Sequence, residues 1–262
     1  MSTFIKSKTS IKSYIMTLYL ALLPVMILSA SVSKQGFLKL LFVVLYSFAF
    51  GYLIQKLDNK ITKKQVAYQN SFYPIYLLVS NIVLDSVSLF SVLIQLVVLV
   101  VCVLCKLRIN IMSLLMLVNL VLAKLLNIVY LNELVPLIIL FTSYVILRTN
   151  IAYKENIALY SYMFFVFLSL IYGIMINDVS LILNRALNGL NLITIIFILT
   201  DVKSSPINKT DIFRYACSYA VLAFLFNVCF NIAIGGVLAA LLISIIFNAK
   251  KKVILPFYAK KC

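Results

Sequence analysis

The sequence predicts an all-α protein that lies in a membrane and crosses it with about ten helices. Three observations support this fold class: 64% of the residues are hydrophobic, only 11% are charged, and the apolar residues form runs that short charged segments separate. A soluble globular domain carries about 25% charged residues, so the composition excludes that class. We therefore expect one polytopic membrane domain, residues 1–262.

Apolar runs separated by charges indicate ten candidate spans. Their approximate bounds are 14–32, 37–55, 71–84, 88–105, 111–131, 134–147, 157–176, 189–200, 213–230 and 232–249. The first run follows a cluster of lysines, as the apolar part of a signal peptide does. Because it is longer than such a part, we expect it to be a retained span.

The distribution of basic residues gives the orientation of these spans, because lysine and arginine are enriched in cytoplasmic loops. With the N-terminus in the cytoplasm, only Lys34, Lys39, Lys124 and Arg185 of the 23 basic residues fall outside the cytoplasmic segments. We therefore expect a multi-pass protein of the plasma membrane, surrounded by the lipid bilayer, with both termini cytoplasmic. The same loops explain the formal charge of +16, so nucleic acid is not an expected partner.

Ten spans divide into two halves of five, at about residues 1–132 and 133–262. Because five is odd, the second half enters the membrane from the opposite side, which is the topology of an inverted repeat. The third span of each half, 71–84 and 189–200, is short. At ~1.5 Å per residue, the eleven residues from Leu190 to Thr200 cover roughly half of the ~30 Å hydrocarbon core.

Short or broken helices at matching positions of two halves point to a site near the middle of the membrane. Spans three and eight are therefore expected to be half-length helices that meet near the bilayer centre, beside a polar cavity. A polar cavity at that depth supplies hydrogen-bond partners for the N–H and C=O groups of backbone that is not helical. The residues expected to line it, and to contact a cofactor, are Asn81, Thr200 and Asp201.

Charged residues near the ends of spans are candidates for an ion pathway, since a charge in the membrane is costly unless it is solvated or paired. The candidates are Asp85, Asp201 and Lys124. The alternative for Asp201 is a cytoplasmic position just past a helix end, and for Asp85 it is an outer turn. The Lys124 ammonium, deep in the fifth span, either reaches the outer interface or pairs with an acidic residue inside the bundle.

Small and amide residues in the last hairpin indicate close helix packing. Asn227 and Asn231 are expected to donate hydrogen bonds between helices, and Gly235 and Gly236 to let two helices approach closely. We interpret the roles of these asparagines and glycines as structural.

The cysteines and the missing histidine limit the chemistry that we expect. Cys102 and Cys105 have a C-x-x-C spacing, but we interpret them as small apolar side chains in a helix rather than as a redox pair. The chain has no histidine, and we expect no metal site. No self-contained catalytic motif is present, so the sequence leaves enzymatic activity open.

Two segments carry a family signature. Phe4–Pro24 reads FIKSKTSIKSYIMTLYLALLP: a short polar segment, a Ser/Lys/Thr cluster, a methionine and an A-L-L-P span. Residues 187–214 contain a glycine-bearing span, F-x-x-T-D, S-P and an arginine, at Gly189, Phe197, Thr200, Asp201, Ser205, Pro206 and Arg214. Both segments resemble the membrane subunits D of Rnf and B of Nqr, which belong to ion-pumping electron-transport complexes. That family has ten spans in an inverted five-plus-five arrangement, so the resemblance implies the same fold.

The chain departs from this family where the family binds flavin covalently. The family attaches a flavin phosphate to the threonine of an S-G-A-T motif after the fifth span, and no G-A-T occurs here. The corresponding turn is Asn132-Glu133, and the triplet Thr200-Asp201-Val202 lacks the proline of the family. Covalent FMN is therefore not expected.

The resemblance implies a membrane subunit that takes part in electron transport coupled to ion translocation. It also implies other membrane subunits as partners and a flavin (FMN or riboflavin) or a quinone as a non-covalent cofactor. The alternative is a small-solute transporter or channel on the same inverted-repeat scaffold, because broken helices also serve that function.

Overall fold

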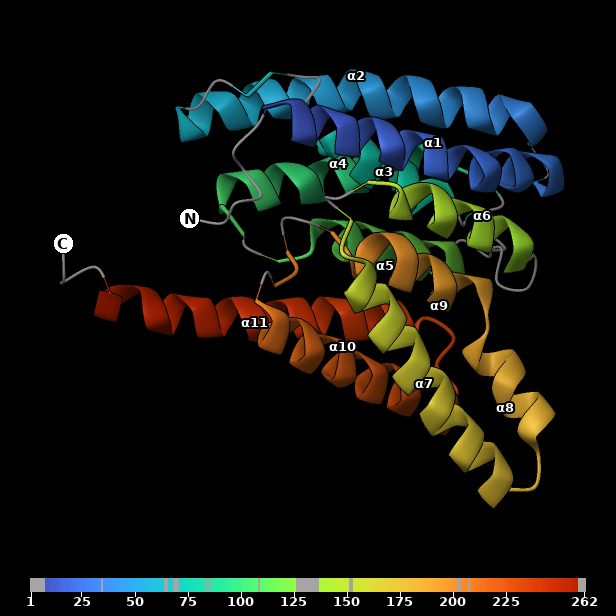
Figure 1. The fold of residues 1–262 in the computed structure, drawn as a ribbon. Helices are drawn as coiled ribbons and strands as arrows, with labels where there is room; N and C mark the ends of the chain where they lie inside the picture. Colours follow the sequence, from blue (N-terminus) through green and yellow to red (C-terminus); the bar gives the residue numbers. More distant parts are fainter. Residues whose placement is uncertain are drawn as a thin grey trace. The chain divides into compact units, whose positions relative to one another are not determined.

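The computed structural model describes residues 8–33, 35–63, 66–67, 71–82, 84, 86–107, 109–125, 137–150, 153–201, 204–206 and 208–258; residues 8–11, 32, 137–138 and 248–258 are described by their backbone alone. Over this part of the chain the secondary structure is helical and contains no strand (Figure 1). The prediction of an all-α fold is therefore confirmed for the described residues.

Several helices have the length and composition of membrane spans. Four are long and apolar enough to cross a membrane: Lys12–Ser31, Gly36–Thr62, Glu155–Met175 and Lys209–Cys229. The helices Val179–Ala186 and Gly189–Ile198 provide a fifth if they form one broken span, in which the two parts are bent by 44°. Among the described residues, four or five helices are therefore long and apolar enough to span a membrane, and the ten spans with their inverted repeat stay a prediction.

Large apolar side chains are exposed on many of the described helices. Leu38, Leu89 and Met175, for example, are 77%, 72% and 74% exposed. Soluble proteins rarely expose apolar patches of such extent. The exposed apolar faces indicate contact with the hydrocarbon of a lipid bilayer.

The chain forms two compact units. Unit 1 comprises Met1–Leu107 and Ile111–Tyr153, and unit 2 comprises Arg108–Asn110 and Lys154–Cys262. The main boundary between the two units therefore follows Tyr153. The boundary between the two expected halves follows residue 132, earlier in the chain.

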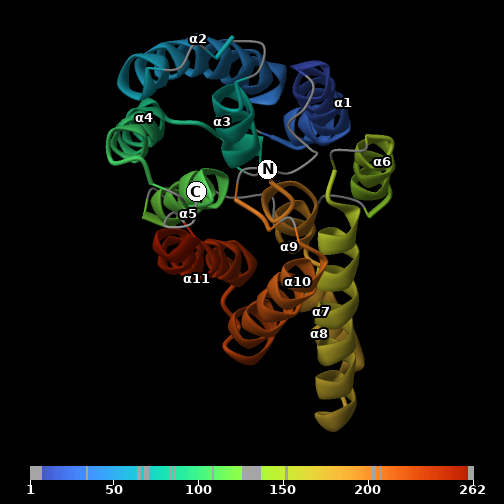
Figure 2. The same ribbon diagram turned by 60° about the vertical axis from the view of Figure 1, so that its left-hand side comes forward.

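Unit 1 surrounds one short helix with longer ones. Its helices are α1 (Lys8–Val32), α2 (Gly36–Thr62), α3 (Tyr73–Ile82), α4 (Leu89–Leu104), α5 (Ile111–Leu125) and α6 (Leu137–Arg148). The ten residues of α3 are all buried, and α3 packs against α1, α2 and α5 (Figure 2). A helix buried on every side must be apolar all round, which explains why its only polar residues lie in its last turn.

The start of α3 depends on a proline and a glycine. Pro74 is the second residue of the helix, where its missing N–H is not needed. A Cβ atom at Gly51 of α2 would lie only 2.6 Å from Pro74 Cγ, so the glycine allows α3 to begin directly against α2. At the other end, the Ser29 hydroxyl donates a hydrogen bond of 2.6 Å to the Ile82 carbonyl.

Unit 2 contains the second short, buried helix. Its elements are α7 (Glu155–Met175), α8 (Val179–Ala186), α9 (Gly189–Ile193), the π-helix η3 (Thr194–Ile198), α10 (Lys209–Ala223), the π-helix η4 (Phe224–Cys229) and α11 (Gly235–Tyr258). The α10 helix packs against α7 and α11, and α11 also contacts α9 and η3. Every residue of α9 and η3 is buried.

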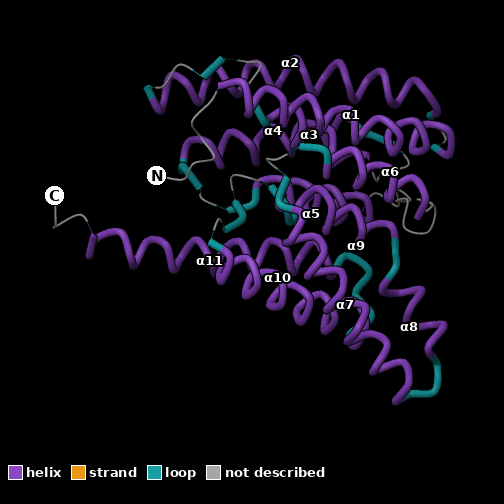
Figure 3. Tube along the Cα trace, in the orientation of Figure 1, coloured by secondary structure: helices purple, strands orange, loops and turns teal. Residues whose placement is uncertain are grey.

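The helix formed by α9 and η3 has a cap at its start and a widened turn at its end. Asn188 Oδ1 accepts a hydrogen bond of 2.9 Å from Leu190 N, and the Leu199 N–H bonds across five residues to Thr194 O at 2.8 Å. Loops flank this helix and α3 (Figure 3). With five plus five residues in α9–η3 and ten in α3, both helices are short, while their role as matching half-length helices of an inverted repeat stays a prediction.

The helix α8 was not expected, because it falls between the candidate spans 157–176 and 189–200. Asp178 caps α8, since its Oδ1 accepts a hydrogen bond of 3.1 Å from Leu181 N. The amphipathic sequence VSLILNRA buries Ile182 and Ala186 on one face. A helix of eight residues is too short for a span, which is why apolar runs do not reveal it.

Candidate functional site

A cluster of polar side chains fixes the last turn of α3 inside unit 1. The residues of this amide cluster are Tyr46, Ser80, Asn81, Gln95 and Asn119, and all are at most 5% exposed. Asn81 Nδ2 donates to Gln95 Oε1 at 2.9 Å, and Gln95 Nε2 donates back to Asn81 Oδ1 at 3.1 Å. Gln95 Nε2 also donates to Asn119 Oδ1, and Asn119 Nδ2 donates to the Ser80 carbonyl at 2.7 Å. Tyr46 Oη donates to Gln95 Oε1 at 3.1 Å.

The amide cluster joins four helices through uncharged polar groups. Tyr46 comes from α2, Asn81 from α3, Gln95 from α4 and Asn119 from α5. Hydrogen bonds between membrane helices contribute about 0.6–2 kcal/mol each, whereas a buried group left without a partner costs about 1–3 kcal/mol. The cluster therefore holds α3 in place while presenting amide groups within an otherwise apolar unit.

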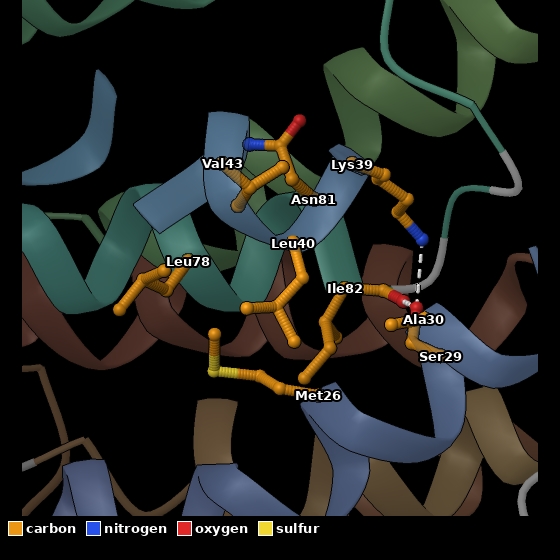
Figure 4. A pocket seen from close by; sticks show the side chains of 9 residues that line it. All are labelled: Met26, Ser29, Ala30, Lys39, Leu40, Val43, Leu78, Asn81 and Ile82. Carbon is orange, nitrogen blue, oxygen red and sulfur yellow. Dashed lines mark hydrogen bonds between the residues drawn. The ribbon is translucent and has the colours of Figure 1, made fainter. Parts of the chain in front are cut away.

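A buried lysine lies at the C-terminal end of α3. Lys39 is 4% exposed, and its Nζ donates to Ser29 Oγ at 2.7 Å and to the Leu84 carbonyl. Figure 4 shows the ammonium directed at Ser29, beside a cavity of about 20 Å³ that Asn81 also lines. A cavity of this size holds about one water molecule. The positive charge complements the negative end of the α3 dipole.

The N-terminal part of α9 carries an amide pair. Asn227 Nδ2 of η4 donates to Asn191 Oδ1 at 2.8 Å, and Asn191 Nδ2 donates to the Arg185 carbonyl at 3.2 Å. A Cβ atom at Gly236 would overlap Asn191 Oδ1, so α11 reaches α9 only because this residue is glycine. The predicted roles of Asn227 and Gly236 are confirmed. Asn231 is exposed with φ of 53° in a turn, so its predicted role as a donor between helices is wrong.

The C-terminal end of η3 leads into a buried polar loop. Asp201 is 4% exposed, and its Oδ2 accepts a hydrogen bond of 3.0 Å from Ser204 Oγ. Asn110 Nδ2 donates to Ser204 Oγ at 3.0 Å and to the Ile198 carbonyl at 2.7 Å. Asp201 is therefore buried just past the end of η3, and the choice between a pathway residue and a cytoplasmic position past a helix end stays open.

A lysine also bonds this loop: Lys154, the residue that precedes α7. Lys154 Nζ donates to Ser205 Oγ at 2.6 Å and to the Ser205 carbonyl at 2.9 Å. Ser205 Oγ in turn donates to the Asp201 carbonyl at 2.6 Å. The loop after the half-length helix is thus held by side chains from distant parts of the sequence, which fixes the position of the Asp201 carboxylate.

The other predicted site residues have separate surroundings. Thr200 is fully buried, and its hydroxyl donates to the Ile196 carbonyl of its own helix at 2.6 Å. Lys124 is exposed in the last turn of α5, which fits a side chain that extends toward an interface. Asp85 lies outside the described residues. Asn81 belongs to unit 1 and Asp201 to unit 2, so a cavity lined by both stays a prediction.

The residues of these clusters that the sequence did not indicate include Gln95, Asn191, Asn110 and Lys39. Gln95 and Asn191 could have been found as single amide residues inside apolar runs, because buried polar residues in membrane helices form hydrogen bonds with one another. The distant partners of Asn110 and Lys39 leave no local pattern in the sequence.

A groove between α10 and α11 adds a larger concave surface to unit 2. Its volume is about 680 Å³, within the usual range of ligand sites. Asp211 and Arg214 line it near the start of α10, and Leu222, Ile246 and Phe247 supply apolar walls. Within the part of the chain that the structure describes, no group of three or more Cys, Asp or Glu side chains could hold a metal ion.

Comparisons of the chain with known protein families and with curated proteins find no match. The function therefore has to be inferred from the two half-length helices, their polar neighbours and the resemblance of the two sequence segments.

Proposed function

We propose that this protein is a membrane subunit of an electron-transport complex that resembles Rnf and Nqr, and that it carries part of the path of the translocated ion. The observation that supports the proposal best is the pair of short, wholly buried helices, α3 and α9–η3. Discontinuous helices at the centre of a membrane protein are a common way to build sites for ions and substrates.

The polar groups around these helices suit a small cation. The amide cluster offers carbonyl oxygens beside α3, and Asp201 offers a carboxylate at the end of η3. Retaining such groups inside an apolar unit is costly, which is why polar residues within membranes are usually functional. π-Helical turns such as η3 and η4 also occur frequently at functional sites.

The groove of unit 2 fits the non-covalent cofactor that the resemblance implies. Its apolar walls suit the ring system of a flavin or a quinone, and Arg214 would donate hydrogen bonds to a carbonyl or phosphate oxygen. When bound, the cofactor would supply the electron-transfer chemistry. The protein would supply the position of the ring and the charge near it.

A transporter of a small polar solute is the second candidate. The observation that favours it is the uncharged character of the amide cluster, because Asn81, Gln95 and Asn119 offer both donors and acceptors of hydrogen bonds. A solute such as an amide or a sugar would need both, whereas a cation needs oxygen atoms only.

The proposal is tested with the full-length chain, purified in mild detergent together with any subunits that accompany it. Acid denaturation is expected to release flavin or quinone, and the denatured polypeptide is expected to show no fluorescent band of covalent flavin. Proteoliposomes are expected to take up radioactive sodium when a reduced donor is added. Release of no cofactor together with no donor-dependent sodium uptake would contradict the proposal, and uptake of an uncharged solute would favour the second candidate.

A further inference from the structure

Lys39 lies near a helix end, from which a lysine side chain usually reaches the membrane interface. It is the fourth residue of α2, which begins at Gly36, and its neighbours Phe37 and Leu38 are 64% and 77% exposed. Lys39 is instead 4% exposed, so its side chain turns into unit 1. Burying a charge is costly unless it is paired and hydrogen-bonded, so groups inside the unit must hold the ammonium.

Two buried oxygen atoms accept hydrogen bonds from the ammonium. Ser29 Oγ, in a residue that is 3% exposed, accepts from Lys39 Nζ at 2.7 Å, and the carbonyl of Leu84, which is 1% exposed, accepts from the same nitrogen. A hydroxyl has one proton, and the proton of Ser29 is donated to the Ile82 carbonyl at 2.6 Å. Both oxygens therefore present lone pairs to Lys39 Nζ.

The end of α3 adds partial negative charge to this position. Ile82 is the last residue of α3, and the last carbonyls of a helix carry partial negative charge because they lack partners within the helix. Apolar residues line the cavity beside the ammonium, among them Met26, Ala30 and Val43, and charges interact more strongly in such surroundings than in water. Carbonyl groups and the C-terminal ends of short helices also coordinate sodium in membrane transport proteins.

We propose that the Ser29 hydroxyl and the Leu84 carbonyl form a site for a monovalent cation, which we call the Lys39 site, and that the ammonium of Lys39 is its permanent occupant. Because the occupant is part of the chain, the site is filled at every salt concentration. A metal cation from solution does not bind there, since it would be repelled by the ammonium. Without that ammonium, the same oxygen atoms bind an alkylammonium ion or sodium.

The Lys39 site is distinct from the amide cluster, although Lys39 and Asn81 line the same cavity. In Figure 4 the ammonium is directed at Ser29, whereas the amide group of Asn81 is directed away from it. The inference concerns this end of α3 and does not depend on the proposed function. If the protein translocates an ion, that ion is not expected to bind at the Lys39 site.

The test measures the thermal stability of the purified full-length protein in detergent, with choline chloride as the background salt. In Lys39→Ala we expect a Tm that is lower by about 4–24 °C, because the buried oxygens of Ser29 and Leu84 lose their donor. The part of the side chain that this variant lacks resembles n-propylammonium, so this ion can fill the site again. At about ten times its dissociation constant, n-propylammonium is expected to raise the Tm of Lys39→Ala by about 3–6 °C.

Two controls accompany this variant. Tetramethylammonium has the same charge as n-propylammonium but no N–H group, so it is expected to leave the Tm of Lys39→Ala unchanged. Lys56→Ala makes the same substitution at an exposed residue of the same helix, and it is expected to keep the Tm of the natural protein and to show no response to n-propylammonium. A Tm of Lys39→Ala that responds to neither ion, or equally to both, would overturn the inference.

Lys39→Met provides a second test, which does not depend on the folding of the alanine variant. Methionine replaces the apolar stem of the lysine and leaves the position of the ammonium nitrogen open to sodium. When sodium replaces choline at about ten times its dissociation constant, we expect the Tm of Lys39→Met to rise by about 3–6 °C more than that of the natural protein. An equal sodium response of the two proteins would show that Lys39 does not occupy a cation site. Proteoliposomes in which the natural protein takes up no sodium would contradict the proposed function alone.

Discussion

The substitution Gly236→Val is expected to destabilise the protein by about 2–6 kcal/mol, because it forces two closely packed helices apart. Any Cβ atom at this position overlaps Asn191 Oδ1 and reaches Tyr219 Oη at 3.2 Å. The valine would push α11 away from α9, and Asn191 would lose the hydrogen bond from Asn227. The expected result is a Tm lowered by about 4–24 °C, on the scale of about 2–4 °C per kcal/mol.

The control for this substitution is Gly36→Asn in unit 1. A Cβ atom at Gly36 meets nothing within 4 Å, and its φ of +55° is one that asparagine tolerates. Thermal unfolding in detergent should therefore give a Tm for Gly36→Asn close to that of the natural protein. A small loss in Gly236→Val, similar to that of the control, would show that α11 does not depend on close approach to α9.

The substitution Gln95→Leu is expected to destabilise the protein almost as strongly. Leucine has nearly the shape of glutamine but removes the side chain that bonds Tyr46, Asn81 and Asn119 at once. Asn119 Oδ1 would then lack its donor and the Tyr46 hydroxyl its acceptor, at about 1–3 kcal/mol each, whereas Asn81 would keep its bonds to Tyr46 Oη and to the Leu77 carbonyl. We expect a loss of about 3–5 kcal/mol, measured by thermal or chemical unfolding.

Gln55→Leu provides the comparison for this change. Gln55 is equally buried on α2, but its Nε2 donates one hydrogen bond, to Asn59 Oδ1 at 2.9 Å. Its loss is expected to cost about 1 kcal/mol. Equal destabilisation by the two leucine variants would mean that the amide cluster acts as separate contacts rather than as a connected network.

Most helices could be predicted from the sequence, because apolar runs in a membrane protein need helical backbone to satisfy their N–H and C=O groups. Each of the ten expected segments contains a helix of the structure, and the short third segment of each half appears as α3 and as α9–η3. The helix α8 was missed because its eight residues are too few for a span.

The candidate site was less predictable, because its partners come from distant parts of the sequence. Asp201 and Asn81 could be selected as polar residues at the ends of short spans. Nothing local indicates that Asn110 reaches the loop after η3, or that Lys39 turns inward to Ser29. Even Asp58, which the pattern assigns to a loop, lies in α2 and accepts a hydrogen bond of 3.0 Å from the Tyr73 hydroxyl.

Sodium uptake by proteoliposomes that contain Asp201→Asn tests the central proposal most directly, namely that the polar groups at the ends of the buried half-length helices carry the ion. The matched variant is Asp178→Asn, because asparagine also caps a helix and so preserves the start of α8. Asp178→Asn is expected to take up sodium at the rate of the natural protein. Asp201→Asn is expected to lose at least about 90% of that rate, since removal of a charged ligand costs about 1.5–3 kcal/mol and each ~1.4 kcal/mol is tenfold. Equal uptake by the two variants would contradict the proposal and would place Asp201 among the structural residues of the loop.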